Sequence, residues 1–310
     1  MIISTFVCLC IIFSQVNAQS NTFGHCKEEV CCNQQANPLL TSCKDIKRKW
    51  SDGPTGYYQL SSTKRGPVSV YCNMDELCGS RGGWTRLGYL NMADPSESCP
   101  SGFRLYQSGG VRACGRQNSS VGSCVSLKLL ADDISYSQVC GRVVGYQYAS
   151  TDAADSTIGT SAHNDINSYY VDGVSITHGS PRQHVWTLMA GLHEASFYFI
   201  VNDGRYNCPC SQSSTQNSTL QSFIGNDYFC ESGNPATDGT YQFMLYTSDP
   251  LWDSEGCGSL EGTCCAAPSL PWFHKKLNTT TTDYLELRVC GDEGTNNEDT
   301  PISFYEIYIK

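Results

Sequence analysis

Three histidines, His178, His184 and His193, are the side chains of this chain best suited to acid–base or metal chemistry. Their spacings of six and nine residues place no two of them on one helical face, and they do not form the H-E-x-x-H pattern of zinc enzymes. These spacings favour solvent-facing or hydrogen-bonded histidines in a β region. No nucleophile elbow, phosphate loop or dinucleotide fingerprint occurs. The sequence therefore predicts a protein that is not an enzyme.

An acidic stretch near the C-terminus offers the hard oxygen ligands that calcium prefers. It contains four carboxylates within eight residues, from Asp292, Glu293, Glu298 and Asp299. Calcium takes about six to eight oxygen ligands in proteins, so this stretch is the candidate metal site, although its spacing is not that of an EF-hand. A solvated hairpin loop between the last two strands explains the same residues without an ion. No other cofactor is predicted.

The cysteines and the N-terminus indicate a secreted protein. Residues 1–18 are typical of a signal peptide, because residues 2–13 form an apolar run and residues 16–18 supply a small-residue cleavage site after Ala18. Two of the nineteen cysteines, Cys8 and Cys10, lie in this run and seventeen remain, too many for a reducing cytosol. The odd number implies a free thiol or an intermolecular bridge. No later stretch is apolar enough for a membrane anchor.

The cysteine spacings favour disulfides over zinc, because the chain has adjacent cysteines and a C-P-C motif instead of paired C-x2-C motifs. The adjacent Cys264 and Cys265 are expected to bond to two different partners, since successive residues of an extended segment point to opposite faces. The candidate partners are Cys230, Cys257 and Cys290. The sequence does not choose between them.

The net charge of −10 excludes nucleic acid as an expected partner, because phosphates require a basic surface. The same charge is compatible with cations or a mineral surface. Three N-glycosylation acceptors, Asn118, Asn217 and Asn278, occur in polar stretches where we expect turns. A glycoprotein is therefore predicted.

Alternating hydrophobicity predicts the elements that must position these groups. The pattern is that of an α+β protein, predominantly antiparallel β, with long loops stapled by disulfides. In the C-terminal region, Leu285, Leu287 and Val289 alternate with polar residues, which predicts a half-buried strand. The expected strands cover residues 68–71, 84–90, 125–130, 143–148, 184–190, 197–201, 241–245, 284–289 and 302–309.

A short helix is predicted after Thr41 or Ser42, either of which can cap it. Four of its residues, Cys43, Ile46, Lys47 and Trp50, would share one face. The sequence Asp52-Gly-Pro then ends the helix.

Four short motifs frame this helix and the strands after it. They are Cys43-Lys-Asp-Ile, Gly56-Tyr-Tyr, Val70-Tyr-Cys72-Asn-Met and Gly82-Gly-Trp84-Thr. Together they resemble the opening of a fibrinogen-related domain, a secreted module for adhesion and recognition, and the start of the intelectins, which are calcium-dependent lectins. The resemblance covers residues 43–90 and implies a disulfide between Cys43 and Cys72.

Beyond Trp84 the later signatures of the fibrinogen-related family are missing: there is no Asp-x-Asp calcium loop and no Asn-Cys-Ala followed by Gly-Gly-Trp-Trp. The whole chain is similar in style to uncharacterised matrix proteins of coral skeletons. The expected organisation is a signal peptide (1–18), a Cys-rich lead-in (19–42), a fibrinogen-like subdomain (43–90) and a β-rich domain (91–310).

Three functions are compatible with these observations. The first is a non-catalytic, secreted extracellular matrix protein, which includes a component of a mineralised organic matrix. The second is a secreted lectin of the fibrinogen-related or intelectin type, with glycans as partners. The third is a secreted hydrolase. The sequence favours the first, with extracellular matrix or a mineral surface as the partner.

Overall fold

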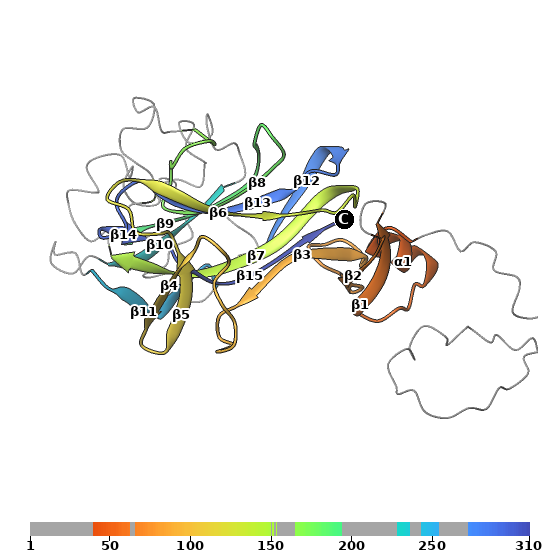
Figure 1. The fold of residues 1–310 in the computed structure, drawn as a ribbon, viewed down its shortest axis with the longest axis horizontal. Helices are drawn as coiled ribbons and strands as arrows, with labels where there is room; N and C mark the ends of the chain where they lie inside the picture. Colours follow the sequence, from red (N-terminus) through yellow and green to blue (C-terminus); the bar gives the residue numbers. More distant parts are fainter. Residues whose placement is uncertain are drawn as a thin grey trace, which may run out of the picture. The chain divides into compact units, whose positions relative to one another are not determined.

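The computed structural model describes residues 40–62, 66–149, 151, 153, 165–193, 228–235, 243–253 and 272–310. The described residues from Leu40 to Lys310 belong to one compact unit. They form one helix and fifteen strands, most of them antiparallel. Figure 1 shows their arrangement. Four disulfides link the described residues. The prediction of a mainly antiparallel β fold with disulfides is thus confirmed.

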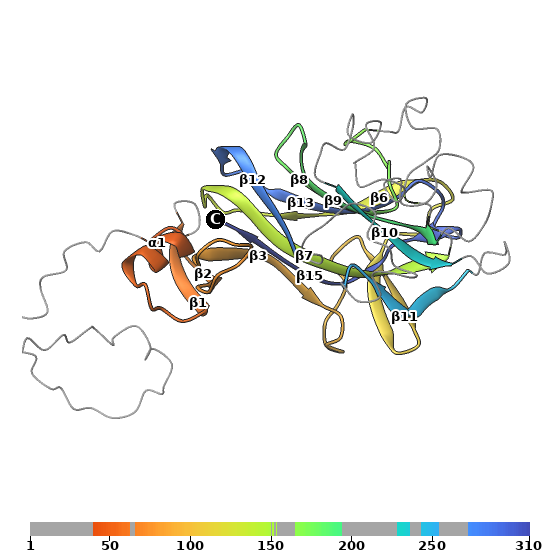
Figure 2. The same ribbon diagram turned by 180° about the vertical axis from the view of Figure 1, so that it is seen from behind.

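The larger sheet has ten strands. Its main path is β1 (Gly56–Ser62), β2 (Gly66–Asn73), β3 (Trp84–Asn91), β15 (Ile302–Ile309), β5 (Val111–Gly115) and β4 (Arg104–Ser108). The long strand β7 (Tyr136–Ala149) pairs with β15, β11 (Leu245–Leu251), β12 (Trp272–Thr281) and β14 (Glu298–Asp299). The strand β15 therefore lies between β3 and β7, and joins the first strands of the chain to the rest (Figures 1 and 2).

The smaller sheet has five strands. Their order is β10 (Tyr228–Pro235), β9 (Gln183–His193), β8 (Gly173–His178), β13 (Leu285–Gly291) and β6 (Ser123–Leu129). β10 runs parallel to β9, and the other neighbours are antiparallel. Every residue of β13 is buried, so the prediction of a half-buried strand is wrong. On the second face of β13, Arg182 donates to the carboxylate of Glu286, and Arg288 donates to the main-chain oxygen of Ile166. These contacts cover that face as well.

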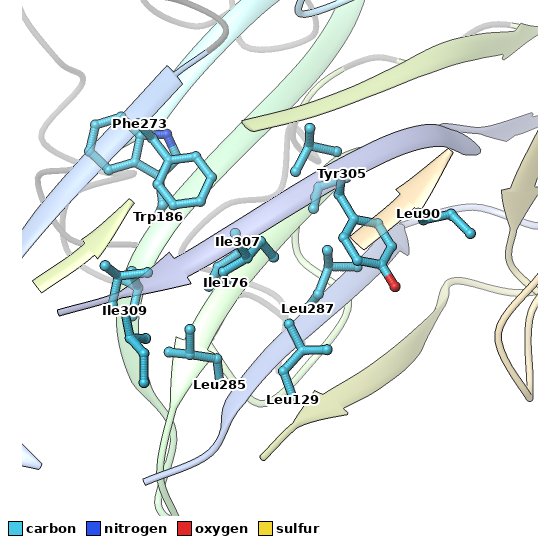
Figure 3. Packing of buried hydrophobic residues seen from close by; sticks show 14 of the residues in the cluster. Leu90, Leu129, Ile176, Trp186, Phe273, Leu285, Leu287, Tyr305, Ile307 and Ile309 are labelled. Carbon is cyan, nitrogen blue, oxygen red and sulfur yellow. The ribbon is translucent and has the colours of Figure 1, made fainter. Parts of the chain in front are cut away.

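The hydrophobic core lies between the two sheets, as Figure 3 shows. The smaller sheet contributes Leu129, Ile176, Leu285 and Leu287, and the larger sheet contributes Leu90, Tyr305, Ile307 and Ile309. Each of these side chains is at least nine-tenths buried. Burial of one such aliphatic side chain stabilises a fold by about 1.5–3 kcal/mol, so this shared core holds the two sheets together.

The helix α1 (Cys43–Lys49) begins where the sequence predicts. The hydroxyl of Ser42 accepts a hydrogen bond from the main-chain N of Asp45 at 3.2 Å, and Cys43 and Ile46 are buried. Trp50 is 42 % exposed, so the prediction that it shares one face with Cys43 and Ile46 is wrong. The helix ends at Lys49, and position 50 therefore no longer follows the helical period. None of the described helical structure is long and apolar enough to cross a membrane.

The predicted strands agree with β2, β3, β6, β13 and β15 within two residues at each end. The strands expected at 143–148 and 184–190 are present but longer, because β7 begins at Tyr136 and β9 ends at His193. The predicted strand at 241–245 is wrong in part, because β11 begins only at Leu245. Phe243 and Met244 precede it and are 61 % and 44 % exposed. The strand expected at 197–201 lies outside the described residues.

Candidate functional site

The described disulfides join residues that are between 15 and 166 positions apart in the sequence. Cys43 is joined to Cys72, the pairing that the fibrinogen-related resemblance implies, and the bridge ties α1 to β2. The other described bridges are Cys78–Cys140, Cys99–Cys114 and Cys124–Cys290. Cys290 is therefore excluded as a partner of Cys264 or Cys265.

The pairing of Cys290 has a simple cause in the sheet register. Cys124 and Cys290 stand directly opposite each other on the antiparallel neighbours β6 and β13. Sequence spacing does not reveal this proximity, because 166 residues separate the two cysteines. Cys264 and Cys265 themselves lie outside the described residues.

A band of aromatic and arginine side chains crosses the face of the larger sheet that points away from the core. We call it the aromatic–arginine ladder, and it consists of Tyr57, Tyr71, Arg86, Tyr89, Phe304, Arg142 and Trp272. These residues come from six strands that are neighbours in the sheet, β1, β2, β3, β15, β7 and β12. The ladder therefore extends across most of one sheet face.

The first half of the ladder is centred on Arg86. Its guanidinium carbon lies 3.9 Å from the ring centroid of Tyr71 and 4.6 Å from that of Tyr89. Its Nη2 atom also donates a hydrogen bond to the hydroxyl of Tyr57 at 3.2 Å. The ring of Tyr57 meets that of Tyr71 edge-to-face, with 5.3 Å between centroids. A cation between aromatic rings is held by about 0.5–2 kcal/mol per contact, so Arg86 connects three strands.

The second half of the ladder is centred on Arg142. Its guanidinium carbon lies 4.6 Å from the ring of Phe304 and 5.0 Å from that of Trp272. Its Nε donates to the carboxylate of Glu306 at 2.6 Å. Because both arginines are already fixed by neighbouring rings, the ladder presents a preorganised surface.

A β-bulge places Arg86 and Tyr89 on the same face. Residues 86 and 89 of a regular strand point to opposite faces, since side chains alternate. Here Arg86 is opposite Tyr308 while Gly88 is opposite Ile307, so Leu87 is an extra residue in β3. The extra residue shifts the alternation by one and creates the stack on Arg86.

A groove opens beside Arg86, where β2 and β3 diverge. These two strands share only two register pairs, Cys72 with Thr85 and Asn73 with Trp84. The diverging parts enclose a pocket of about 320 Å³, which residues of the turn before β7 also line. Its lining comprises Tyr57, Ser69, Val70, Tyr71, Thr85, Arg86, Leu87, Gly88, Tyr89, Leu130, Ala131, Asp132 and Ile134. Aromatic rings, a cation and hydroxyl groups thus converge on one concave site.

The predicted calcium residues are partly brought together and partly separated. Carboxylate oxygens of Asp292 and Glu298 lie within 4.8 Å of each other and of Asp172. Glu293 is exposed and accepts a hydrogen bond from Asn297 at 3.0 Å. Sequence reasoning missed Asp172, which is 120 residues away from Asp292 and accepts a hydrogen bond from its main-chain N.

The fourth predicted ligand, Asp299, is engaged by a buried arginine. Its Oδ1 accepts from Nε of Arg116 at 3.0 Å, and its Oδ2 accepts from the hydroxyl of Tyr106 at 2.8 Å. Glu298 and Asp299 are each 1 % exposed and form β14, so the alternative of a solvated hairpin loop is wrong for them. Two of the four predicted ligands thus remain near Asp172.

Arg116 neutralises this acidic end of the molecule. Burial alone would lower the pKa of its guanidinium, but the charges of Asp299, Asp172 and Glu298 outweigh burial and raise that pKa. The guanidinium also donates to the main-chain oxygens of Gly291, Glu293 and Glu298 at 2.9–3.0 Å. Arg116 therefore fixes the loop between β13 and β15.

The histidines do not converge on one site among the described side chains. His178 lies 3.1 Å from the carboxylate of Asp283, and His184 lies 2.8 Å from the hydroxyl of Thr187. The side chain of His193 is outside the described residues.

Two of the three glycosylation acceptors lie in the described residues. Asn118 is exposed between β5 and β6, as a glycan requires. Asn278 is also exposed, but it lies within β12 and the expectation of a turn is wrong there. Asn217 is outside the described residues.

Comparison with protein-family models, with curated proteins and with solved structures found no match for this chain. The function therefore has to be argued from the chain's own residues. The groove, the aromatic–arginine ladder and the acidic cluster of Asp172, Asp292 and Glu298 are the features that carry chemistry.

Proposed function

We propose that the protein is a secreted, non-catalytic component of an extracellular matrix, a mineralised organic matrix included, and that it acts by presenting a surface. The aromatic–arginine ladder is the observation that carries this proposal. It spreads rings and cations over six strands of one sheet face, which suits contact with an extended partner. Rigid, preorganised contact surfaces lose little conformational entropy on binding.

Disulfides and charge support the same proposal. Four described bridges staple both sheets, which is typical of proteins from oxidising, extracellular surroundings. Asn118 and Asn278 are exposed and accessible to glycosylation. The net charge of −10 favours association with cations or a mineral surface.

The alternative is a calcium-dependent lectin of the fibrinogen-related type. The cluster of Asp172, Asp292 and Glu298 would then hold the ion. However, Asp172 and Glu298 are each only 1 % exposed, so an ion between them would be shielded from a sugar in solution. This burial supports a stabilising role for any bound calcium, and the matrix function remains the first proposal.

Sequential extraction of the source tissue tests the matrix proposal. We expect the protein to resist saline and to be released by a chelator, by denaturant with reductant, or by both. Mass spectrometry of each fraction would measure the release and would also detect glycans on Asn118 and Asn278. Recovery mainly in the saline fraction would contradict the proposal.

A glycan pull-down of the purified protein, with and without chelator, tests the alternative. Capture that is lost in chelator and in Asp292→Asn would favour the lectin. Equal results in both buffers would count against it.

A further inference from the structure

The groove between β2 and β3 combines exposed aromatic rings with many hydrogen-bond donors. Tyr57 is 69 % exposed and Tyr89 is 45 % exposed, although both are large hydrophobic side chains. The lining adds the guanidinium of Arg86 and the hydroxyls of Tyr71 and Ser69. Its volume of about 320 Å³ is at the lower end of the range for ligand pockets, about 300–1,000 Å³.

The donors and acceptors among these side chains are unequal. Guanidinium groups only donate, and tyrosine and serine hydroxyls donate as well as accept. The carboxylate of Asp132 is the one acidic side chain in the lining. A ligand that matches this site must therefore offer apolar ring surface together with an excess of hydrogen-bond acceptors.

We propose that this groove binds a proline-rich peptide segment in the polyproline II conformation. Such a segment has no internal hydrogen bonds, so its carbonyl oxygens are available as acceptors, and proline supplies no N–H donor. Its pyrrolidine rings pack on tyrosine rings, as in the aromatic-lined grooves of known polyproline-binding modules. The segment is already extended before it binds, which keeps the entropy cost low.

Charge distinguishes this ligand from acidic ones. The protein carries a net charge of −10, and in the groove the carboxylate of Asp132 balances the guanidinium of Arg86. Both disfavour a sulfated or carboxylated polymer and favour a proline-rich segment flanked by basic residues. A neutral sugar is distinguished from this ligand by the control ligands below.

This inference deepens the proposed matrix function and rests on it for the presence of the partner, since proline-rich segments would meet the protein outside the cell. The two can fail separately. A protein that is found in the insoluble matrix but does not bind the peptide would retain its proposed function and lose this inference. Peptide binding by a protein found only in the saline fraction would support this inference and contradict the proposed function.

Fluorescence anisotropy with the full secreted chain tests the inference. The probe is a labelled nonaproline peptide with a C-terminal lysine. We expect saturable binding that Tyr89→Ala and Tyr57→Ala each weaken at least about tenfold, because an exposed aromatic ring is a typical binding hot spot. Arg86→Lys should also weaken binding, since an ammonium group cannot stack in the same way. Binding should be unchanged in Phe243→Ala, which removes an equally exposed aromatic ring that precedes β11.

Control ligands complete the test, and urea unfolding of each variant shows whether it is folded. A nonaglycine peptide with the same lysine should not bind. Absence of saturable binding of the proline peptide up to about 1 mM would overturn the inference. Tighter binding of a chitin hexasaccharide or a heparin hexasaccharide, lost in Tyr89→Ala, would also overturn it and assign the groove to glycans. Equal binding to Tyr89→Ala and the native protein would place the peptide elsewhere.

Discussion

Among single residues, Arg116 has the largest predicted effect on stability. Its side chain is 1 % exposed, and it binds Asp299 as well as Glu293 in the loop before β14. Arg116→Met should lower the free energy of unfolding by about 3–5 kcal/mol, because the buried Asp299 then keeps only the partly exposed Arg104, 3.9 Å away, as a cation. Urea unfolding with the disulfides intact measures this loss.

Arg48 provides the matched control for Arg116. Its side chain is 71 % exposed and faces Asp45 at 3.4 Å on the helix surface. Arg48→Met should change the free energy of unfolding by less than about 1 kcal/mol. Similar losses in the two variants would show that Arg116 does not act as a buried ion-pair partner.

Glu286 predicts a pH dependence of stability. Burial would raise the pKa of its carboxyl, but hydrogen bonds from Arg182 and Ser126 and the nearby positive charges lower it below the ordinary value of 4.5. The unfolded chain therefore binds the proton more tightly, so the stabilisation is complete above pH 4.5 and is lost as the pH falls through the lowered pKa.

Glu286→Gln tests this dependence. The variant should be less stable than the native protein at neutral pH, and the difference should shrink below a pH of about 4.5. Urea unfolding at neutral pH and in mild acid measures both differences. A difference that stays constant over this range would mean that the charge of Glu286 is not responsible.

At the level of single elements, β8 depends on a glycine. Gly173 has a φ of +156°, and a Cβ there would collide with the main-chain oxygen of Leu188 on the adjacent strand β9. Gly173→Ala should lower the free energy of unfolding by about 3 kcal/mol through this clash. Gly56→Ala is the control, because a Cβ at Gly56 has no neighbour within 4 Å. If Gly173→Ala and Gly56→Ala lost equal stability in thermal unfolding, the clash with Leu188 would not be the cause.

Two disulfides of very different span allow a second test on elements. Cys124–Cys290 joins β6 to β13 across 166 residues, while Cys99–Cys114 spans only 15. Removal of the longer bridge by paired alanines should cost about 5 kcal/mol, against about 3 kcal/mol for the shorter one, because a longer loop restricts the unfolded chain more. Comparison of the urea midpoints checks the order, which the reverse ranking would contradict.

Element prediction from the sequence succeeded where one face of a strand is buried. Ile302, Tyr305, Ile307 and Ile309 are buried in β15, which was predicted over its full length. Prediction failed for β13, where Glu286 and Arg288 looked solvent-facing. Their burial depends on Arg182 and on the segment before β8, and a local pattern does not contain such distant partners.

At the scale of the whole molecule, the candidate site required information that only the pairing of strands supplies. The ladder residues extend from Tyr57 to Phe304, and each of them alone is an ordinary strand residue. The bulge at Leu87 that brings Arg86 beside Tyr89 has no separate sequence signal. Asp172 likewise joins the acidic cluster through tertiary folding. The disulfide from Cys43 to Cys72 was expected because the motifs around it resemble a fibrinogen-related domain, and the structure contains it.

The position of β15 also has a consequence for biosynthesis. This strand follows every other described strand in the sequence, yet it lies between β3 and β7 in the sheet. If the chain is secreted as proposed, β3 and β7 leave the ribosome and enter the oxidising lumen with adjoining edges open. Cys78 and Cys140, which link the segment before β3 to β7, meet this environment before residues 302–309 have been made. Chaperones and disulfide isomerases would then have to keep these early strands from aggregating or cross-linking wrongly until the last one arrives.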